Sequence, residues 1–458
     1  MNEETIVFEG AADLAALLAC GALRGSLAGF AQPRGPDLVR RIQPLDDWCA
    51  LRAAHGLWQH ARALDGAATR GIDFAASDCL SLAAHPAVRE AASDALLDAG
   101  PHSAGPASLL GNSHLSLALE AALGALLQFG HVTLFPAGWS AVFGAVTALV
   151  HARDYVLIDA AAGPALRQGA HAATPKVVAH RHLDTGHVRE ILAAIRARDT
   201  DNGILVVTEG LFGMDADVPD LPLMQHLCRE YGATLLVDVA RDLGAMGPGG
   251  SGSLGQQAML GKADIVVGDF AQAFAANGGF VAGNSRALKR RLQLFAGPSL
   301  SSALSPVAAA CALAALRISA SPEGDALRAA LVRNALGLRA HLAETGMRCL
   351  GIPAPIVPVW IGSEPVARLA GRSLAREGVF VDVAECDGVH IGPPAPNGEA
   401  RLRLQVMAGH IPAQLRQGAR AIGAAIAGAG AALGVEPGSL PPGLEPGSLP
   451  PGHGRRHA

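Results

Sequence analysis

Hydrophobic and polar positions follow two alternating patterns in the central part of the chain, from Ile72 to about Ile318. Short runs rich in β-branched residues recur, and helical stretches such as SLALEAALGALLQF and DLPLMQHLCREYG separate most of them. The expected strands are HVTLF, DYVLID, KVVAH, GILVVTEG, ATLLVDVA, ADIVVG and GGFVAG. Strands that alternate with helices are typical of an α/β fold with a mostly parallel sheet. Ligands of such sheets bind at the carboxyl ends of the strands.

The same patterns divide the chain into four segments. Residues 1–71 are expected to form an N-terminal helical segment, because AADLAALLAC has apolar residues at helical spacing. Residues 72–320 form the large α/β domain. Residues 321–430 begin with a long helix, continue with the strands PIVPVWIG, VFVDVAE and ARLRLQVM, and predict a smaller α+β domain. Residues 431–458 contain VEPGSLPPG and LEPGSLPPG, and proline and glycine at this density predict a disordered tail.

Composition and charge exclude several classes of function. Half of the 458 residues are hydrophobic, and the formal net charge of −4 gives no general attraction to nucleic acid. The seven cysteines are dispersed and form no CxxC pair, which favours reduced thiols, a cytoplasmic location and no metal site. The first residues lack the basic region of a signal peptide. The apolar runs are shorter than the roughly 20 residues of a membrane-spanning helix, so no transmembrane segment is expected.

Several polar residues stand where predicted strands end. Asp238 follows the apolar run LLV, and Glu209 and Asp215 flank the end of GILVVTEG. A buried aspartate is costly unless a cation or hydrogen-bond donors compensate it, so a lone Asp238 would be read as a cap or an ion pair. Gly138 lies in a turn that opens a helix, where backbone N–H groups bind phosphate well. Together these strand ends predict an anion pocket with an acidic floor.

The order of these segments resembles the α-oxoamine synthase family, of pyridoxal-phosphate (PLP) fold type I. Its members include 8-amino-7-oxononanoate synthase, 2-amino-3-ketobutyrate CoA ligase and serine palmitoyltransferase. The resemblance runs from about Phe74 to His410. It rests on FAASDCLSLAAHPAV, GPASLLGNSHLSLALE, VTEGLFGMDAD, VDVARDLGAMGPGG, SSALSPVAAA and ARLRLQVMAGH, which follow one another in the family's order. It implies an aminotransferase-like large domain and a decarboxylative condensation of an amino acid with an acyl thioester.

The resemblance also assigns roles to individual positions. Asp238 matches the aspartate that pairs with the pyridinium nitrogen of PLP. Gly138 and Trp139 match the turn whose amides hold the phosphate. A segment that reaches a phosphate across the dimer interface is matched by Ser301 and Ser302. Arg403, at the end of this set, matches the arginine that grips the substrate carboxylate, for which a guanidinium fork is well suited.

Three positions depart from the family pattern, and all three belong to the reacting centre. Gln272 stands at the place of the lysine that forms the Schiff base with PLP. Gly163 replaces the histidine that stacks on the PLP ring, and Arg241 replaces the histidine that contacts the ring hydroxyl. Glutamine forms no imine and is no base near neutral pH. Proton transfers by such a lysine typically contribute roughly 10²–10⁴-fold each to the rate.

No other lysine is expected to substitute for the missing one. The chain has only Lys176, Lys262 and Lys289. Lys262 precedes the strand that Gln272 follows, and six extended residues span about 20 Å. Lys176 likewise precedes a strand, and Lys289 lies in the basic helix RALKRR.

These departures favour a homologue without the ordinary synthase activity, acting as partner or regulatory subunit of an active paralogue. A eukaryotic serine palmitoyltransferase subunit, which lacks the lysine yet supports its catalytic partner, is the precedent that the resemblance offers. We expect a homodimer or a heterodimer with a lysine-bearing paralogue. Covalent attachment of PLP is not expected, and non-covalent binding stays open. The alternatives are an acyltransferase that uses PLP non-covalently and a binding protein for an acyl thioester or acyl carrier protein.

Overall fold

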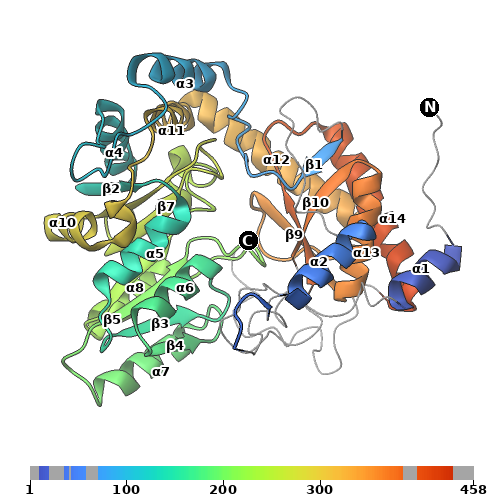
Figure 1. Ribbon diagram of the computed structural model, residues 1–458, viewed down its shortest axis with the longest axis horizontal. Helices are drawn as coiled ribbons and strands as arrows, with labels where there is room; N and C mark the ends of the chain where they lie inside the picture. The colour runs from blue at the N-terminus through green and yellow to red at the C-terminus, as the bar shows by residue number, and fades with distance from the viewer. Residues whose placement is uncertain (1–9, 20–35, 41–42, 58–70, 385–399, 437–458) are drawn as a thin grey trace.

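Two β-sheets organise the structure. The computed structural model describes residues 10–19, 36–40, 43–57, 71–384 and 400–436. Figure 1 shows two lobes, each built around one of the sheets, with the long helix α12 running from one lobe to the other.

The larger sheet has seven strands, in the order β2-β8-β7-β6-β5-β3-β4. Neighbouring strands are parallel, except that β8 is antiparallel to both β2 and β7. Every residue of the central strand β5 is buried, as expected for a parallel strand covered on both faces. The strands are β2 (His131–Phe135), β3 (Tyr155–Asp159), β4 (Val177–His180), β5 (Ile204–Glu209), β6 (Thr234–Asp238), β7 (Ile265–Asp269) and β8 (Gly279–Gly283). The predicted α/β class with a mostly parallel sheet is confirmed.

Helices pack on both faces of this sheet. One face packs against α5, α6 and α10, and the other against α4, α7, α8 and α11. Successive side chains of each strand point to opposite faces of the sheet. Leu236 of β6 packs in the core on the α5 side, and Leu235 and Val237 pack in the core on the α4 side. The helices of this lobe are α3 (Pro86–Ala99), α4 (His114–Leu127), α5 (Gly138–Leu149), α6 (Pro164–Ala173), α7 (Thr185–Arg196), α8 (Leu221–Glu230), α9 (Gly252–Gln256), α10 (Arg286–Phe295) and α11 (Pro306–Ser319), with the 3-10 turns η3 (Pro248–Gly250) and η4 (Gly297–Leu300).

The smaller sheet has the order β1-β10-β11-β9. Its strands are β1 (Ile72–Phe74), β9 (Ile356–Gly362), β10 (Val379–Ala384) and β11 (Ala400–Gln405), and it packs with α12 (Pro322–Glu344), α13 (Glu364–Arg376) and α14 (Pro412–Leu433). The sequence places residue 72 at the start of the large domain, yet β1 pairs in parallel with β10 of the smaller sheet. Strand pairing therefore joins this early segment to the C-terminal lobe, because hydrophobic periodicity fixes a strand but not its partner.

The segments predicted at the two ends of the chain are described only in part. Helices α1 (Gly10–Ala19) and α2 (Gln43–Ala54) fall within the predicted N-terminal helical segment. At the other end α14 continues to Leu433, and the proline-rich repeat from residue 437 onward lies outside the described residues. Among the helices that the structure describes, none is long and apolar enough to cross a membrane.

Candidate functional site

Four neighbouring strands of the larger sheet, β7, β6, β5 and β3, end in carboxylates, and the first three concern the predicted site. Glu209 of β5 lies beside Asp238 of β6 in the strand register, and Asp238 lies beside Val267 of β7, two residues before Asp269. Glu209 is buried, whereas Asp238 and Asp269 are half-buried. The structure thus brings Glu209 and Asp238 together, as the acidic floor predicted from the sequence requires, and it adds Asp269.

Burial sets the protonation of these groups. Burial is the largest cause that raises the pKa of Glu209 to about 7; Arg241 and the Gly163 hydrogen bond oppose this shift, and Asp238 and Asp159 add to it. Burial likewise raises the pKa of Asp238 to about 6, against the hydrogen bond that its carboxylate accepts from the Ala240 N–H at 2.9 Å. The pKa of Asp269 is raised to about 6 by burial and then by Asp238. Carboxylates in low-dielectric surroundings hold their protons more tightly.

Gly163 and Arg241, which stand at the two family histidine positions, both adjoin Glu209. The backbone N–H of Gly163 donates to Oε1 of Glu209 at 2.5 Å. A Cβ built on Gly163 would lie 3.1 Å from the same oxygen, so even an alanine there would crowd the carboxylate. Nε of Arg241 lies 3.7 Å from Oε2 of Glu209, and the guanidinium passes over Gly213. Gly163 therefore contacts Glu209 through its backbone and Arg241 through its guanidinium, and their match to the family histidines stays a prediction.

Gln272 follows β7, and its backbone hydrogen-bonds to the carboxylate of Asp269 at the end of that strand. Its side-chain amide donates to Oγ of Ser77 at 3.3 Å. Its backbone carbonyl accepts from both the N–H and the thiol of Cys79, at 2.9 and 3.0 Å. These contacts tie the turn at Gln272 to the segment that follows β1, so the side chain at this position has a structural partner.

The three lysines of the chain lie away from Gln272. Nζ of Lys176 donates to the Arg153 carbonyl at 2.8 Å, before the start of β4. Lys289 on α10 pairs with Glu120 of α4 at 2.6 Å. Lys262 is exposed and precedes β7, at the end of that strand opposite to Gln272. The expectation that no other lysine serves the strand ends agrees with these positions.

Gly138 and Trp139 open helix α5 directly after β2. Gly138 packs against Asp269: a Cβ built on Gly138 would lie only 2.4 Å from Cβ of Asp269. Trp139 is 46% exposed. The predicted phosphate turn therefore begins a helix as expected, but its first residue is covered by a carboxylate side chain.

The remaining predicted site residues lie at two places, near the carboxyl end of β2 and in the smaller sheet. Ser301 and Ser302 are exposed beyond η4, where they line a small hollow together with Ala107 and Ser108. Arg403 lies on β11 of the smaller sheet. Its guanidinium binds Asp382 of β10, with Nε at 2.9 Å from Oδ2. The roles that the family resemblance gives to these three residues stay predictions.

A buried ion cluster at the end of β3 was not found from the sequence. His182 lies between two carboxylates, with Nδ1 2.7 Å from Asp159 and Nε2 3.1 Å from Asp217. Although burial lowers its pKa, the two hydrogen bonds raise it to about 10, so His182 stays protonated at neutral pH. The residues are far apart in sequence, and only the HLD segment after β4 could have signalled a loop histidine. Asp269, in VVGDFAQ, is a further residue that the sequence did not predict, because its contact with Gly138 joins segments that are far apart in the chain.

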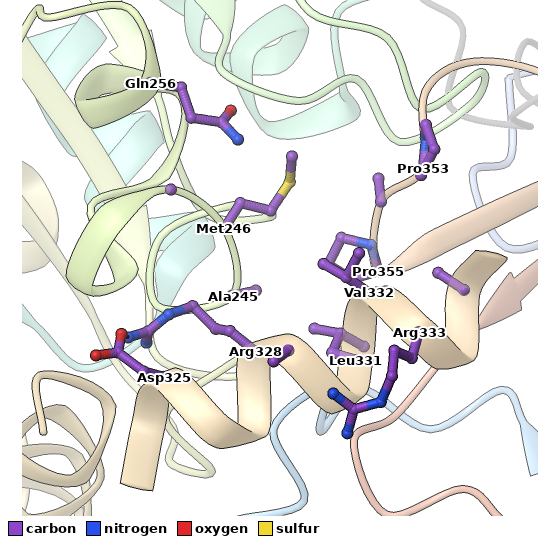
Figure 2. Close-up of a pocket in the computed structure, with 14 residues that line it drawn as sticks. Ala245, Met246, Gln256, Asp325, Arg328, Leu331, Val332, Arg333, Pro353 and Pro355 are labelled. Atoms are coloured by element: carbon purple, nitrogen blue, oxygen red, sulfur yellow. Dashed lines mark hydrogen bonds and ion pairs between the residues drawn. The ribbon is translucent and has the colours of Figure 1, made fainter. Parts of the chain in front are cut away.

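A cavity of about 490 Å³ lies at a different place, beside α12. Figure 2 shows side chains around it from Ala245 and Met246, from α12, and from Pro353 and Pro355 before β9. Arg328 of α12 lines it and donates to the Gly244 carbonyl at 3.2 Å and to the Ser319 carbonyl at 2.7 Å. None of the strand-end carboxylates lines this cavity, so it does not mark the predicted site.

Comparison with known proteins identifies the family and the fold. Residues 69–422 match the sequence profile of the family described as aminotransferase class I and II. The 8-amino-7-oxononanoate synthase of Geobacter sulfurreducens is 33% identical over 356 residues, which cover 78% of this chain and 88% of that protein. The chain belongs to the α-oxoamine synthase family. Serine palmitoyltransferase of Sphingobacterium spiritivorum is 29% identical over 74% of this chain and 83% of the relative.

Solved structures show the same fold for this α-oxoamine synthase homologue. Serine palmitoyltransferase from S. paucimobilis, with a bound PLP–myriocin aldimine, superposes with a TM-score of 0.78 at 24% identity. The match covers 86% of this chain and all of that one. 8-Amino-7-oxononanoate synthase from Francisella tularensis gives 0.65 at 19% identity, covering 79% of this chain and 99% of the other. PLP is the cofactor of the family.

The residues of this homologue fit PLP only in part. Asp238, half-buried at a strand end, suits a protonated pyridine nitrogen, which a carboxylate stabilises. The covalent side does not fit, because Gln272, at the predicted lysine position, has an amide that forms no imine. The phosphate side does not fit either. The Asp269 side chain packs so closely against Gly138 that it takes the space a Cβ on Gly138 would need, and it brings a carboxylate to the turn that would hold the phosphate. As a set, the side chains present do not match the cofactor, and no catalytic step through PLP follows from them.

The raised pKa of Glu209 predicts a pH-dependent effect of Glu209→Gln. The folded protein keeps the Glu209 proton up to about pH 7, whereas the unfolded chain loses it near the ordinary pKa of 4.5. The contribution of this group to stability is therefore complete below pH 4.5 and is lost as the pH rises through 7. At pH 8 we expect Glu209→Gln to raise the free energy of unfolding by about 1–3 kcal/mol, since the buried charge is gone. Urea unfolding at pH 5 and pH 8 measures the effect.

Glu90→Gln, on an exposed face of α3, is the matched control and should change stability little at either pH. An effect of Glu209→Gln that is the same at pH 5 and pH 8 would contradict the raised pKa.

Proposed function

We propose that this α-oxoamine synthase homologue is non-catalytic and acts as the partner or regulatory subunit of a lysine-bearing paralogue. Gln272 at the Schiff-base position is the observation that carries this proposal. Its amide is neither a nucleophile nor a base at neutral pH, and it is engaged with Ser77. Lys176 is bound to the Arg153 carbonyl and Lys289 to Glu120. Lys262 is exposed at the end of β7 opposite to Gln272.

An exposed apolar surface supports a role in a dimer. The segments that carry Ser108, Gln293 and Ser301 meet around one small hollow. Large apolar side chains in or close to these segments along the chain are exposed, and exposed apolar surface is typical of protein–protein contacts. They are Leu109 (76% exposed), Leu110 (82%), Trp139 (46%), Leu294 (61%), Phe295 (59%) and Leu300 (63%). We call these six residues the apolar surface. It adjoins Ser301 and Ser302, so these serines would face a partner's site.

A second candidate function is an acyltransferase that uses PLP without a covalent link. Asp238 favours it, because this carboxylate keeps the family position at a strand end. Arg403 could also grip a substrate carboxylate if it exchanged Asp382 for the ligand. The misfit at Asp269 and Gln272 weighs against this candidate.

Co-expression with a lysine-bearing paralogue from the same genome tests the leading proposal. With only the paralogue tagged, we expect this chain to elute with it in equal amounts, and the complex to form product faster than the paralogue alone. The variant Leu110→Glu places a charge in the apolar surface and should reduce co-elution at least tenfold. Leu336→Glu, at a position of α12 that is 49% exposed, is the matched control and should leave co-elution unchanged. Purification of the wild-type chain as an active homodimer would refute the proposal.

A further inference from the structure

Three backbone segments meet very closely at the first residue of α5. A Cβ on Gly138 would lie 2.4 Å from Cβ and 3.1 Å from Oδ2 of Asp269. A Cβ on Gly279 of β8 would lie 2.7 Å from the Gly138 Cα, and Gly279 pairs with Asp269 across the two strands. Oδ1 of Asp269 accepts from the Ala271 N–H at 3.1 Å, which fixes the side chain's direction. The Asp269 carboxylate is thus held against the start of α5.

The start of a helix attracts an anion, because its first N–H groups have no partner within the helix and its dipole is positive there. In α5 this end opens directly from a strand of the sheet, the arrangement that binds phosphate in many enzymes. A carboxylate of the protein itself already supplies a negative charge beside this position. A phosphate entering there would bring a second and third negative charge next to it.

The groups around Asp269 leave it mostly ionised at neutral pH and do not neutralise it. Asp238 of β6 adds negative charge, and the Cys79 thiol stays uncharged because burial, together with the nearby Asp78, raises its pKa well above the ordinary value. Arg241 is the cation that lowers the pKa of Asp269, yet its guanidinium lies over Gly213 and is shared with Glu209. The Arg241 guanidinium is therefore the cation that lowers the pKa of three carboxyl groups, those of Glu209, Asp238 and Asp269.

We infer that Asp269 fills the anion site at the start of α5 and excludes a phosphate, so this pocket rejects phosphorylated ligands independently of the missing lysine. The inference rests on the proposed loss of synthase chemistry and deepens it. Restoring the lysine alone would not restore a PLP site. An aldehyde without a phosphate, such as pyridoxal, would enter the pocket at least as readily as PLP.

Two variants separate the effect of Asp269 from that of Gln272. Gln272→Lys supplies an amine, and Gln272→Lys/Asp269→Asn additionally removes the charge while it keeps the shape of the side chain. Each protein is incubated with a concentration series of PLP or of pyridoxal and then reduced with borohydride. Peptide mass spectrometry measures the fraction labelled at the introduced lysine, and thermal unfolding verifies that both variants are folded. Gln272→Lys/Asp269→Thr is the alternative variant if the asparagine destabilises the fold.

For Gln272→Lys we expect half-maximal labelling by PLP to need at least as high a concentration as labelling by pyridoxal. In the double variant the preference should shift toward PLP by at least tenfold. The ratio of the two half-maximal concentrations is compared between the two variants, so the difference in reactivity between the two aldehydes cancels. A preference for PLP already present in Gln272→Lys, an unchanged preference in the double variant, or no labelling of either variant would each overturn the inference.

Failure of this inference is distinct from failure of the proposed function. If Asp269 does not exclude phosphate, co-elution with a lysine-bearing paralogue is unaffected. If co-elution fails, the shift in ligand preference still reports on Asp269.

Discussion

Wild-type protein supplied with PLP, an amino acid and an acyl thioester should form the condensation product at least about 10²–10⁴-fold more slowly than a lysine-bearing family member. The reason is local to Gln272. Its amide accepts and releases no proton at neutral pH, it forms no covalent bond to an aldehyde, and Ser77 and Cys79 hold its turn in place. Release of the free thiol from the acyl thioester, corrected for the protein's own cysteines, measures the rate.

The matched control is Gln272→Ala. If the amide has no chemical role, this variant should show the same residual rate as the wild type, within a factor of about two, and similar thermal stability apart from the lost contact with Ser77. A wild-type rate within tenfold of the lysine-bearing relative, or a large loss of rate in Gln272→Ala, would instead favour the acyltransferase that uses PLP non-covalently.

Arg401→Met should lower the free energy of unfolding by about 3 kcal/mol, the lower end for breaking a buried ion pair. Arg401 of β11 is buried, and its guanidinium forms two bonds with Asp215, at 2.5 and 3.1 Å. It also lies over the ring of Trp360, 4.9 Å from the centroid. Asp215 follows β5, so this pair joins the two lobes. Removal of the cation leaves a carboxylate without its partner at the lobe boundary. Urea unfolding at pH 7 measures the loss.

Two further variants show whether the ion pair causes that loss. Arg416→Met, on an exposed position of α14, should change stability by less than about 0.5 kcal/mol. The double variant Arg401→Met/Asp215→Asn should recover part of the loss, because the unpaired charge is gone. Additive losses in the double variant would show that Arg401 acts through packing on Trp360 instead.

The local elements of this protein follow closely from its hydrophobic pattern. Each predicted strand of the larger sheet, from HVTLF to GGFVAG, is a strand in the structure within one or two residues. Asp238 and Glu209 also end their strands as expected. The pattern succeeds here because burial on both faces of a parallel sheet selects continuous apolar runs, and polar residues can return only where a strand leaves the core.

The candidate site could be predicted only in part. The lysine position, and its occupation by Gln272, follow from the order of motifs along the chain. The contacts of Arg241 with Glu209, and of Asp269 with Gly138, do not, because they join strand ends that are distant in sequence. The pairing of Arg403 with Asp382 likewise depends on the register of β10 and β11.

The sequence by itself determined the α/β class, the order of strands and helices along the chain, and the family, and it predicts that Gln272 takes the place of the family lysine. The tertiary structure decided which charged groups meet. It placed β1 in the smaller sheet, joined Asp215 to Arg401 across 186 positions, and set Asp269 against the start of α5. Periodicity reports which side of an element is buried, but the partner of each side chain depends on strand order, register and close backbone approach, which a one-dimensional pattern does not contain.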